Sequence, residues 1–233
     1  MRGAGAASSG VQQPKSLTFG LVIRLFDVKQ YLTNEKEQTE TEIVSTTNIT
    51  RFGSWNVRSC YRVTKRELIV RQLKRYQIEV AALAETNIPD SGIYVVNGYT
   101  FIYSGTLENE RSRAAHGAAV CLGPKASRAW RNSGSTWKAV NSRIVTVRIK
   151  CQPIPITVIA VYAPVNPSNG LKADVEACDE FYKTLQSSID NTNKGDVILI
   201  MGDFNARVGL EQASSASSVV GKHAVDKLNQ NGR

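Results

Sequence analysis

Long apolar runs are missing from this sequence. No stretch of about eighteen apolar residues occurs anywhere in the 233 residues, so we expect no transmembrane helix and no membrane partner. The first twenty residues carry only Arg2 and Lys15 as charges and contain no apolar signal-peptide core, which predicts a protein that is not secreted. We therefore expect an intracellular protein, in the nucleus or the cytoplasm.

Cysteine and histidine are also scarce. The four cysteines, at positions 60, 121, 151 and 178, are too widely spaced for a CxxC zinc pair. The two histidines, His116 and His223, do not accompany them in any zinc-binding pattern. We interpret the cysteines as thiols of the core or the surface, without a functional role.

Positive charge is abundant but unevenly distributed. The net charge is +9, and residues 51–150 alone contain seventeen basic and six acidic side chains. Lysine and arginine clusters attract polyanions, because binding releases the counterions condensed on the phosphates. Charge alone leaves two interpretations open, a nucleic-acid partner and an ordinary solvated basic surface.

The chain divides into an appendage and one domain. Residues 1–50 are rich in Gly, Ala and Ser and end in the polar run TNEKEQTETE, so we expect a mostly disordered extension with room for a short helix or strand across 18–32. Residues 51–233 have the apolar content to bury a single core. No internal repeat is visible.

Two helices are predicted in the domain. The first helix is predicted over 64–76, where Thr64 and Glu67 have the spacing of a capping box at its start. Its apolar stripe is expected to contain Leu68, Ile69, Val70, Leu73 and Tyr76. The second helix is predicted over 171–190, where apolar residues recur at steps of three and four.

Strands are predicted between and around these helices. Asn97-Gly98 favours a type I′ turn within a hairpin over 93–104. Further strands are expected over 78–84, 117–122, 143–151, 156–163 and 196–202. Because hairpins occur among the interleaved elements, a layered α/β sandwich fits better than a doubly wound sheet.

Polar side chains stand where several apolar strands end. Asn56 ends a short strand, Glu85 follows the strand 78–84, Tyr162 follows Val158–Val161, and Asp203 and Asn205 follow Val197–Met201. Each could be an ordinary turn former or helix cap. Together they predict one cleft whose carboxylates could bind a hard cation such as magnesium, while amides and a hydroxyl could contact phosphate.

The order and wording of these motifs carry a resemblance. SWNVRS at 54–59, ALAET at 82–86, VIAVYAP at 158–164 and IMGDFNARVG at 200–209 resemble the endonuclease/exonuclease/phosphatase superfamily. The wording is most similar to the endonuclease domain of non-LTR retrotransposons and to craniofacial development protein 2-like proteins. The resemblance implies a four-layered α/β sandwich of the DNase I-like type and hydrolysis of a nucleic acid, with DNA as the expected partner.

The resemblance also implies roles for individual residues. Glu85 matches the metal-binding glutamate and Asn56 the asparagine that helps arrange the metal site, with Mg²⁺ or Mn²⁺ as the cofactor. Tyr162, Asp203 and Asn205 match the catalytic tyrosine, the aspartate that handles the attacking water and the asparagine that supports phosphate binding. For contacts with nucleic acid, the basic residues near these motifs are the candidates: Arg58, Arg62, Lys65, Arg66, Arg111 and Arg113.

One motif of that superfamily has no counterpart here. The sequence contains no Ser-Asp-His, and neither His116 nor His223 stands in that context. The resemblance therefore implies a domain truncated at the C-terminus, with weak activity or none in residues 1–233. The alternatives are a catalytically dead retrotransposon-derived fragment, a nucleic-acid-binding module, and a phosphatase acting on inositol lipids.

Overall fold

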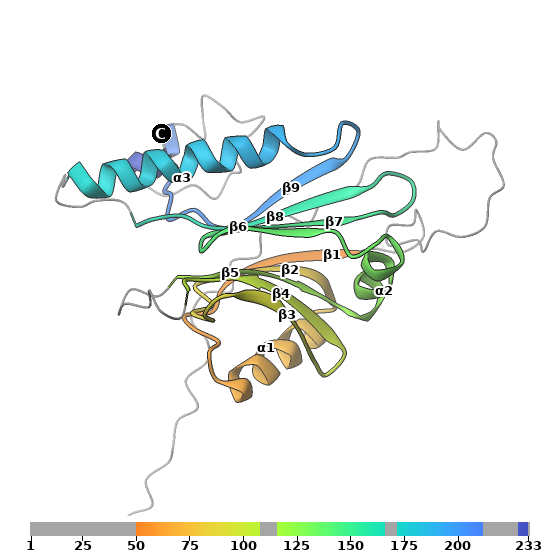
Figure 1. Ribbon diagram of the computed structural model, residues 1–233. Coiled ribbons are helices and arrows are strands. Elements are labelled where there is room, and N and C mark those ends of the chain that lie inside the picture. Colours follow the sequence, from red (N-terminus) through yellow and green to blue (C-terminus); the bar gives the residue numbers. More distant parts are fainter. Residues whose placement is uncertain (1–49, 108–115, 166–171, 212–227, 233) are drawn as a thin grey trace, which may run out of the picture.

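Two stacked β-sheets with a helix on the outer side of each form the body of the molecule (Figure 1). The computed structural model describes residues 50–107, 116–165, 172–211 and 228–232. The extension predicted for residues 1–50, apart from its last residue, lies outside the described ranges, as do Arg111, Arg113 and His223.

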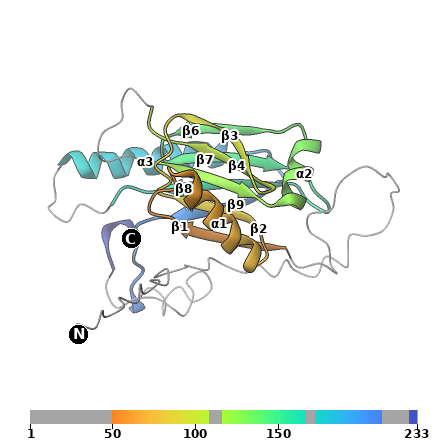
Figure 2. The same ribbon diagram turned by 90° about the horizontal axis from the view of Figure 1, so that it is seen from below.

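The first sheet has five strands in the order β1-β2-β5-β4-β3. They are β1 (Arg51–Asn56), β2 (Ile78–Ala84), β3 (Ser91–Val96), β4 (Tyr99–Ser104) and β5 (Ala118–Leu122). β1 and β2 run parallel, and the other neighbours are antiparallel. Helix α1 (Val63–Arg75) lies across the outer face of this sheet (Figure 2).

The second sheet has four strands in the order β6-β7-β8-β9. They are β6 (Trp137–Asn141), β7 (Ile144–Ile149), β8 (Ile156–Tyr162) and β9 (Val197–Asp203). β8 and β9 run parallel. Helix α3 (Lys172–Asp190) covers the outer face, α2 (Pro124–Asn132) lies at one end of the sandwich, and a short 3-10 helix, η2, spans Gln230–Gly232.

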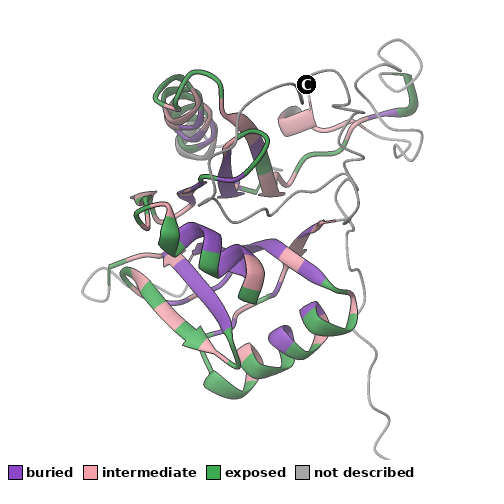
Figure 3. Cartoon of the chain, turned by 90° about the vertical axis from the view of Figure 1, so that its right-hand side faces the viewer, coloured by how far each residue is buried: buried purple, intermediate pink, exposed green. Residues whose placement is uncertain are grey.

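Three apolar clusters hold these layers together, and buried residues concentrate in the strands (Figure 3). The largest lies between the sheets and includes Val80, Ile102 and Val158. A second joins the first sheet to α1 through Ile69 and Leu73, and a third joins the second sheet to α3. The expected α/β fold with four layers is therefore confirmed.

The predicted hairpin is confirmed, but the predicted start of the first helix is wrong. β3 and β4 turn at Asn97 and Gly98, whose φ angles are 48° and 86°. Helix α1 begins one residue before Thr64, and its N-cap residue, Arg62, makes no side-chain capping bond. Leu68, expected in the apolar stripe, is 50% exposed, because the packed face uses Ile69, Val70 and Leu73 instead.

Two elements, α2 and β6, were not predicted. α2 buries mostly small residues, Ala126, Ser127 and Ala129, beside Trp130. Its first turn is held by a side chain distant in sequence, since Glu79 Oε2 accepts a hydrogen bond of 3.0 Å from the Ala126 N–H. Such a long-range cap leaves no local sequence signature.

The four cysteines are all buried thiols. Burial raises the pKa of the Cys60 thiol to about 11, so it remains protonated and unreactive at neutral pH.

Within the described ranges, no helix is long and apolar enough to cross a membrane.

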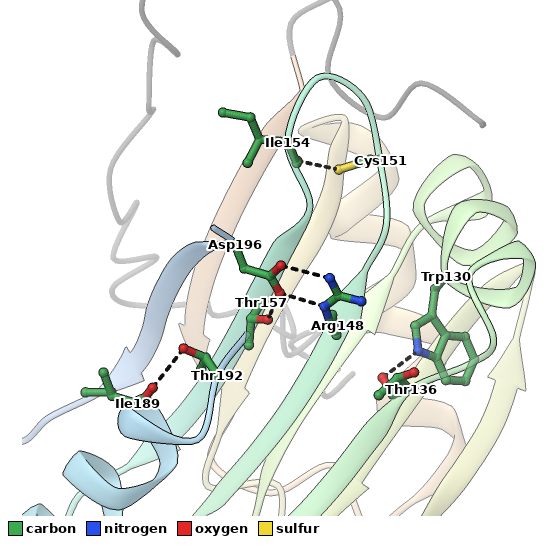
Figure 4. Close-up of polar contacts among 9 residues, drawn as sticks. All are labelled: Trp130, Thr136, Arg148, Cys151, Ile154, Thr157, Ile189, Thr192 and Asp196. Carbon is green, nitrogen blue, oxygen red and sulfur yellow. Dashed lines mark hydrogen bonds and ion pairs between the residues drawn. The ribbon is translucent and has the colours of Figure 1, made fainter. Parts of the chain in front are cut away.

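At one end of the second sheet, Arg148 and Asp196 form a bidentate ion pair (Figure 4). Arg148 of β7 donates to both oxygens of Asp196, from Nε to Oδ2 at 2.7 Å and from Nη2 to Oδ1 at 2.9 Å. Thr157 Oγ1 donates to the same carboxylate at 2.7 Å. These contacts join β7 and β8 to the residue that precedes β9.

Candidate active site

At the end of the molecule opposite to this ion pair, the last residues of β1, β2, β8 and β9 lie together between the two sheets. We call this region the seam; it contains Asn56, Glu85, Tyr162, Asp203 and Asn205. In the parallel pair β1–β2, Asn56 lies beside Ala84, so Glu85 follows directly. In the parallel pair β8–β9, Tyr162 lies beside Asp203. Ser54 Oγ donates to the Gly202 carbonyl at 3.0 Å and so links β1 to β9 across the seam.

Asp203 is held from two sides. Its Oδ2 accepts a hydrogen bond of 2.7 Å from Asn56 Nδ2, and its Oδ1 accepts one of 2.9 Å from the Asn205 N–H. Asn205 has a φ of 46° and donates from Nδ2 to the Ala163 carbonyl at 2.7 Å. The carboxylate is therefore oriented by groups from both sheets, with its charge uncompensated by a cation in those contacts.

Glu85 occupies a backbone conformation that is uncommon for its residue type. Its φ is 57°, in the left-handed region that costs about 1 kcal/mol or more for a residue with a side chain. The Ser59 N–H holds this geometry by donating to the Glu85 carbonyl at 2.7 Å. Strain of this kind is typical of functional sites, where the surroundings impose it.

The hydroxyl of Tyr162 is influenced by the negative charges of both Glu85 and Asp203. Burial raises the pKa of the Tyr162 hydroxyl most strongly, and the negative charges of Glu85 and Asp203 raise it further. A hydrogen-bond interaction with the Glu85 side chain makes the smallest contribution to this raised pKa. A phenol with a raised pKa stays protonated at neutral pH, so Tyr162 is a hydrogen-bond donor here.

A histidine and an arginine that sequence analysis did not assign to the site lie beside this tyrosine. Arg143 Nη2 lies 3.0 Å from His116 Nε2, and Arg143 Nη1 donates to the Tyr162 carbonyl at 3.1 Å. Burial and then the charge of Arg143 lower the pKa of His116 to about 4, so its imidazole is neutral at pH 7. No local pattern marks Arg143, because its partners come from distant parts of the chain.

The basic candidates differ in what their side chains do. Lys65 Nζ donates to the Arg58 carbonyl at 2.7 Å, and Arg66 donates to the carbonyls of Cys60 and Tyr61 and lies over the Tyr94 ring. These two stabilise the loop between β1 and α1. Arg58, two residues after Asn56, and Arg62, at the N-terminal end of α1, are exposed, which leaves their guanidinium groups accessible to an anion.

The segment 228–232 supports the loop that follows β9. Asn229 Nδ2 donates to the Asn205 carbonyl at 2.8 Å, and Asn231 Nδ2 donates to the Pro164 carbonyl at 3.0 Å. Arg207 returns a bond from its N–H to Asn229 Oδ1 at 2.7 Å. Sequence analysis missed this support, since asparagines in a polar segment carry no distinctive signal.

The donor chemistry at the seam fits a hard divalent cation. Glu85 offers a carboxylate, and Asn56 Oδ1, which accepts one bond of 3.0 Å from the Arg58 N–H, retains a second lone pair. In the part of the chain that the structure describes, no three His, Cys, Asp or Glu side chains gather around one point. One or two oxygen ligands suit magnesium or manganese, which keep several waters, and do not suit zinc.

Fold and seam together define an α/β sandwich whose carboxylates, amides and one tyrosine converge at the strand ends of two sheets. No protein-family model matches the chain. Over 182 residues the chain is 28% identical to craniofacial development protein 2 of Bos taurus and 27% identical to that of Tragulus javanicus, matching 78% of its own length in each case. The expected similarity to craniofacial development protein 2 is thus confirmed, and the matched region spans 28% and 29% of those relatives.

Two solved structures show weaker likeness. An endonuclease/exonuclease/phosphatase family protein from Leptotrichia buccalis has a TM-score of 0.44 and 14% identity, with 70% of this chain and 68% of that chain covered. The endonuclease domain of TRAS1, a telomere-specific non-LTR retrotransposon, has a TM-score of 0.35 and 16% identity, with 68% and 60% covered. Scores of this size support no inference about function.

Proposed function

We propose that this chain is a phosphodiesterase domain of the endonuclease/exonuclease/phosphatase type that hydrolyses a phosphodiester of DNA with a divalent metal. The observation that carries the proposal is the seam itself. Asn56 from one sheet donates to Asp203 from the other, and Tyr162 from the second sheet interacts with the Glu85 side chain that follows the first. Two of the strands that supply them, β2 and β8, are otherwise mostly buried and apolar, so the polar residues at their ends are the exception in each.

Glu85 and Asn56 are the residues that would hold Mg²⁺ or Mn²⁺. When bound, such an ion polarises the phosphoryl oxygens and offsets the charge that develops on them. Glu85 follows β2 with a left-handed backbone, at a conformational cost that an extended residue would avoid.

Asp203 is suited to orient or deprotonate the attacking water. Both of its oxygens already accept a bond from a fixed donor, Asn56 or Asn205, so the carboxylate keeps one orientation and each oxygen has a further lone pair. Tyr162, protonated at neutral pH, donates to a phosphate oxygen. Asn205 supports the phosphate with the amide hydrogen that does not bond to Ala163.

Charge favours a nucleic acid over a small phosphate ester. Residues 51–150 carry seventeen basic and six acidic groups, and Arg58 and Arg62, which follow Asn56 in the chain, are exposed. Such an excess of cations suits a polymer with phosphates at regular intervals. DNA binding without cleavage is the second candidate, because His116 is held neutral and so provides no cationic acid for the leaving oxygen.

Nicking of supercoiled plasmid by the full chain in Mg²⁺ tests the proposal. We expect slow nicking that EDTA abolishes and that Glu85→Gln reduces by about 10²-fold or more, since a carboxylate at the metal is lost. Glu67→Gln, on the exposed face of α1, is the matched control and should nick at the wild-type rate. Plasmid binding without nicking would support the second candidate, and phosphate release from inositol phosphates without nicking would contradict both.

A further inference from the structure

We propose that His116 and Arg143 are positioning residues for Tyr162, with the neutral imidazole holding the guanidinium against the tyrosine. The inference rests on the proposed function, because it explains how the tyrosine assigned to the phosphate is kept in place. Neither residue needs to touch the substrate.

A chain of contacts crosses the seam from the residues that follow Glu85 to Tyr162. The His116 carbonyl accepts a bond of 3.1 Å from the Asn87 N–H, and the Gly117 carbonyl accepts one of 3.1 Å from the Thr86 N–H. His116 and Gly117 are therefore tied to the two residues that follow Glu85. The His116 ring contacts Arg143, which precedes β7, and Arg143 donates to the Tyr162 carbonyl.

Arg143 and Tyr162 hold each other reciprocally. The Tyr162 N–H donates to the Arg143 carbonyl at 2.9 Å, and Arg143 Nη1 donates to the Tyr162 carbonyl at 3.1 Å. The guanidinium carbon lies 5.3 Å from the centre of the Tyr162 ring, within the range of a cation–π contact. Backbone and ring are thus restrained together, which limits the directions in which the hydroxyl can point.

The protonation of His116 follows from its partner. Arginine has donors and no acceptor, so His116 Nε2 accepts and the ring proton resides on Nδ1. A protonated imidazole would place a second positive charge 3.0 Å from the guanidinium. The low pKa of His116, about 4, agrees with a permanently neutral acceptor.

A purely structural arginine would be expected to have a carboxylate partner. In the described ranges no carboxylate forms an ion pair with Arg143, whereas Arg148 at the other end of β7 binds Asp196 with two hydrogen bonds. Arg143 is partly buried, and even partial burial of a guanidinium without a counterion costs free energy. An anion arriving at the seam would supply the missing charge, which is the reason to assign this pair to the site.

A matched pair of variants separates the acceptor from the bulk of the ring. His116→Gln keeps an acceptor near the position of Nε2, and His116→Phe keeps the ring without it. In plasmid nicking we expect His116→Phe to lower kcat by about tenfold or more with a small change in KM, because misplacing a reactive group slows the chemical step. His116→Gln should recover most of that loss, and Arg148→Gln, outside the site, should keep the wild-type kcat.

Wild-type kcat in folded His116→Phe would overturn the inference, as would a His116→Gln variant as slow as His116→Phe. If His116→Phe does not fold, Arg143→Lys replaces it, since an ammonium group on a flexible stem cannot make both side-chain contacts; an unchanged kcat there has the same consequence. If the wild type shows no metal-dependent nicking, the proposed function fails while the pairing is still decided by NMR. Slowly exchanging Arg143 Nη–H signals and a Tyr162 ring shift that are lost or moved in His116→Phe and largely retained in His116→Gln support it, and signals unchanged in His116→Phe refute it.

Discussion

The two ends of the second sheet use the same residue types differently. At one end Arg148, Thr157 and Asp196 satisfy one another, with a bidentate ion pair at 2.7 and 2.9 Å. At the other end Arg143 and Asp203 are both present, yet the arginine contacts a histidine and a carbonyl, and the aspartate accepts from amides. Charges are paired where they stabilise the fold and left unpaired at the seam.

This difference separates stability from chemistry along single strands. β7 and β9 each have a charged residue at or next to both ends: Arg143 precedes β7 and Arg148 lies near its other end, and Asp196 precedes β9, which ends at Asp203. A paired charge is neutralised within the protein, so it offers little to a ligand. An oriented but uncompensated charge is poised to interact with a metal, a water or a phosphate, and its retention costs stability.

The substitution with the largest expected effect on stability is Gly202→Ala, at the seam end of β9. Gly202 has a φ of 146°, and an added Cβ would lie 1.9 Å from the Val161 carbonyl oxygen of the neighbouring strand. The β8–β9 register must then shift beside Asp203, so we expect a loss of about 3 kcal/mol in the free energy of unfolding. Urea unfolding followed by circular dichroism measures it.

Gly195→Ala is the matched control at the paired end of β9. Its φ is 96°, but no atom lies within 4 Å of the added Cβ. Only the left-handed backbone is penalised there, which costs about 1 kcal/mol. Equal losses in the two variants would show that the close approach at Gly202 does not determine the seam.

The sequence predicted the polar residues at the strand ends, and the contacts that it did not predict join residues distant along the chain. Asp203 and Asn205 were identifiable because they follow an apolar run directly along the chain, which is local information. The pairing of His116 with Arg143 joins residues 27 positions apart on different sheets, so no periodicity announces it. The predicted start of α1 was wrong for the same reason. The loop before the helix is held by a hydrogen bond from the Cys60 N–H to the Thr86 carbonyl, and a local cap does not hold it.

Asp196→Asn tests the paired end. The Asp196 side chain is 2% exposed and that of Arg148 is 22% exposed, so the substitution leaves a poorly solvated guanidinium without its counterion. We expect a loss of about 2 kcal/mol in the free energy of unfolding at pH 7. Asp190→Asn, on an exposed residue at the end of α3, should stay within about 0.5 kcal/mol of wild type.

The same variant predicts a pH dependence. The hydrogen bond from Arg148 lowers the pKa of Asp196 below 3.8, so the ion pair contributes fully above the unfolded-state pKa and is lost as the pH falls through the folded-state pKa. The stability difference between wild type and Asp196→Asn should therefore be constant near neutrality and shrink below pH 3.8. A difference that grows on acidification would show that another group titrates at this end.

The smallest expected effect concerns the exposed arginines beside the seam. Arg62 stands at the N-terminal end of α1 near Glu85, and Arg71 is exposed on the same helix, about 13 Å further along by helix geometry. If phosphates follow the seam, Arg62→Gln should weaken binding of a DNA duplex and lower the slope of log affinity against log salt by about 1, whereas Arg71→Gln should change it less. Fluorescence anisotropy across a salt series in EDTA measures both without cleavage. Equal slopes for the two variants would mean that DNA binds the basic surface without preferring the positions beside the seam. The contrast between paired and unpaired charges would then hold only for Arg143 and Asp203.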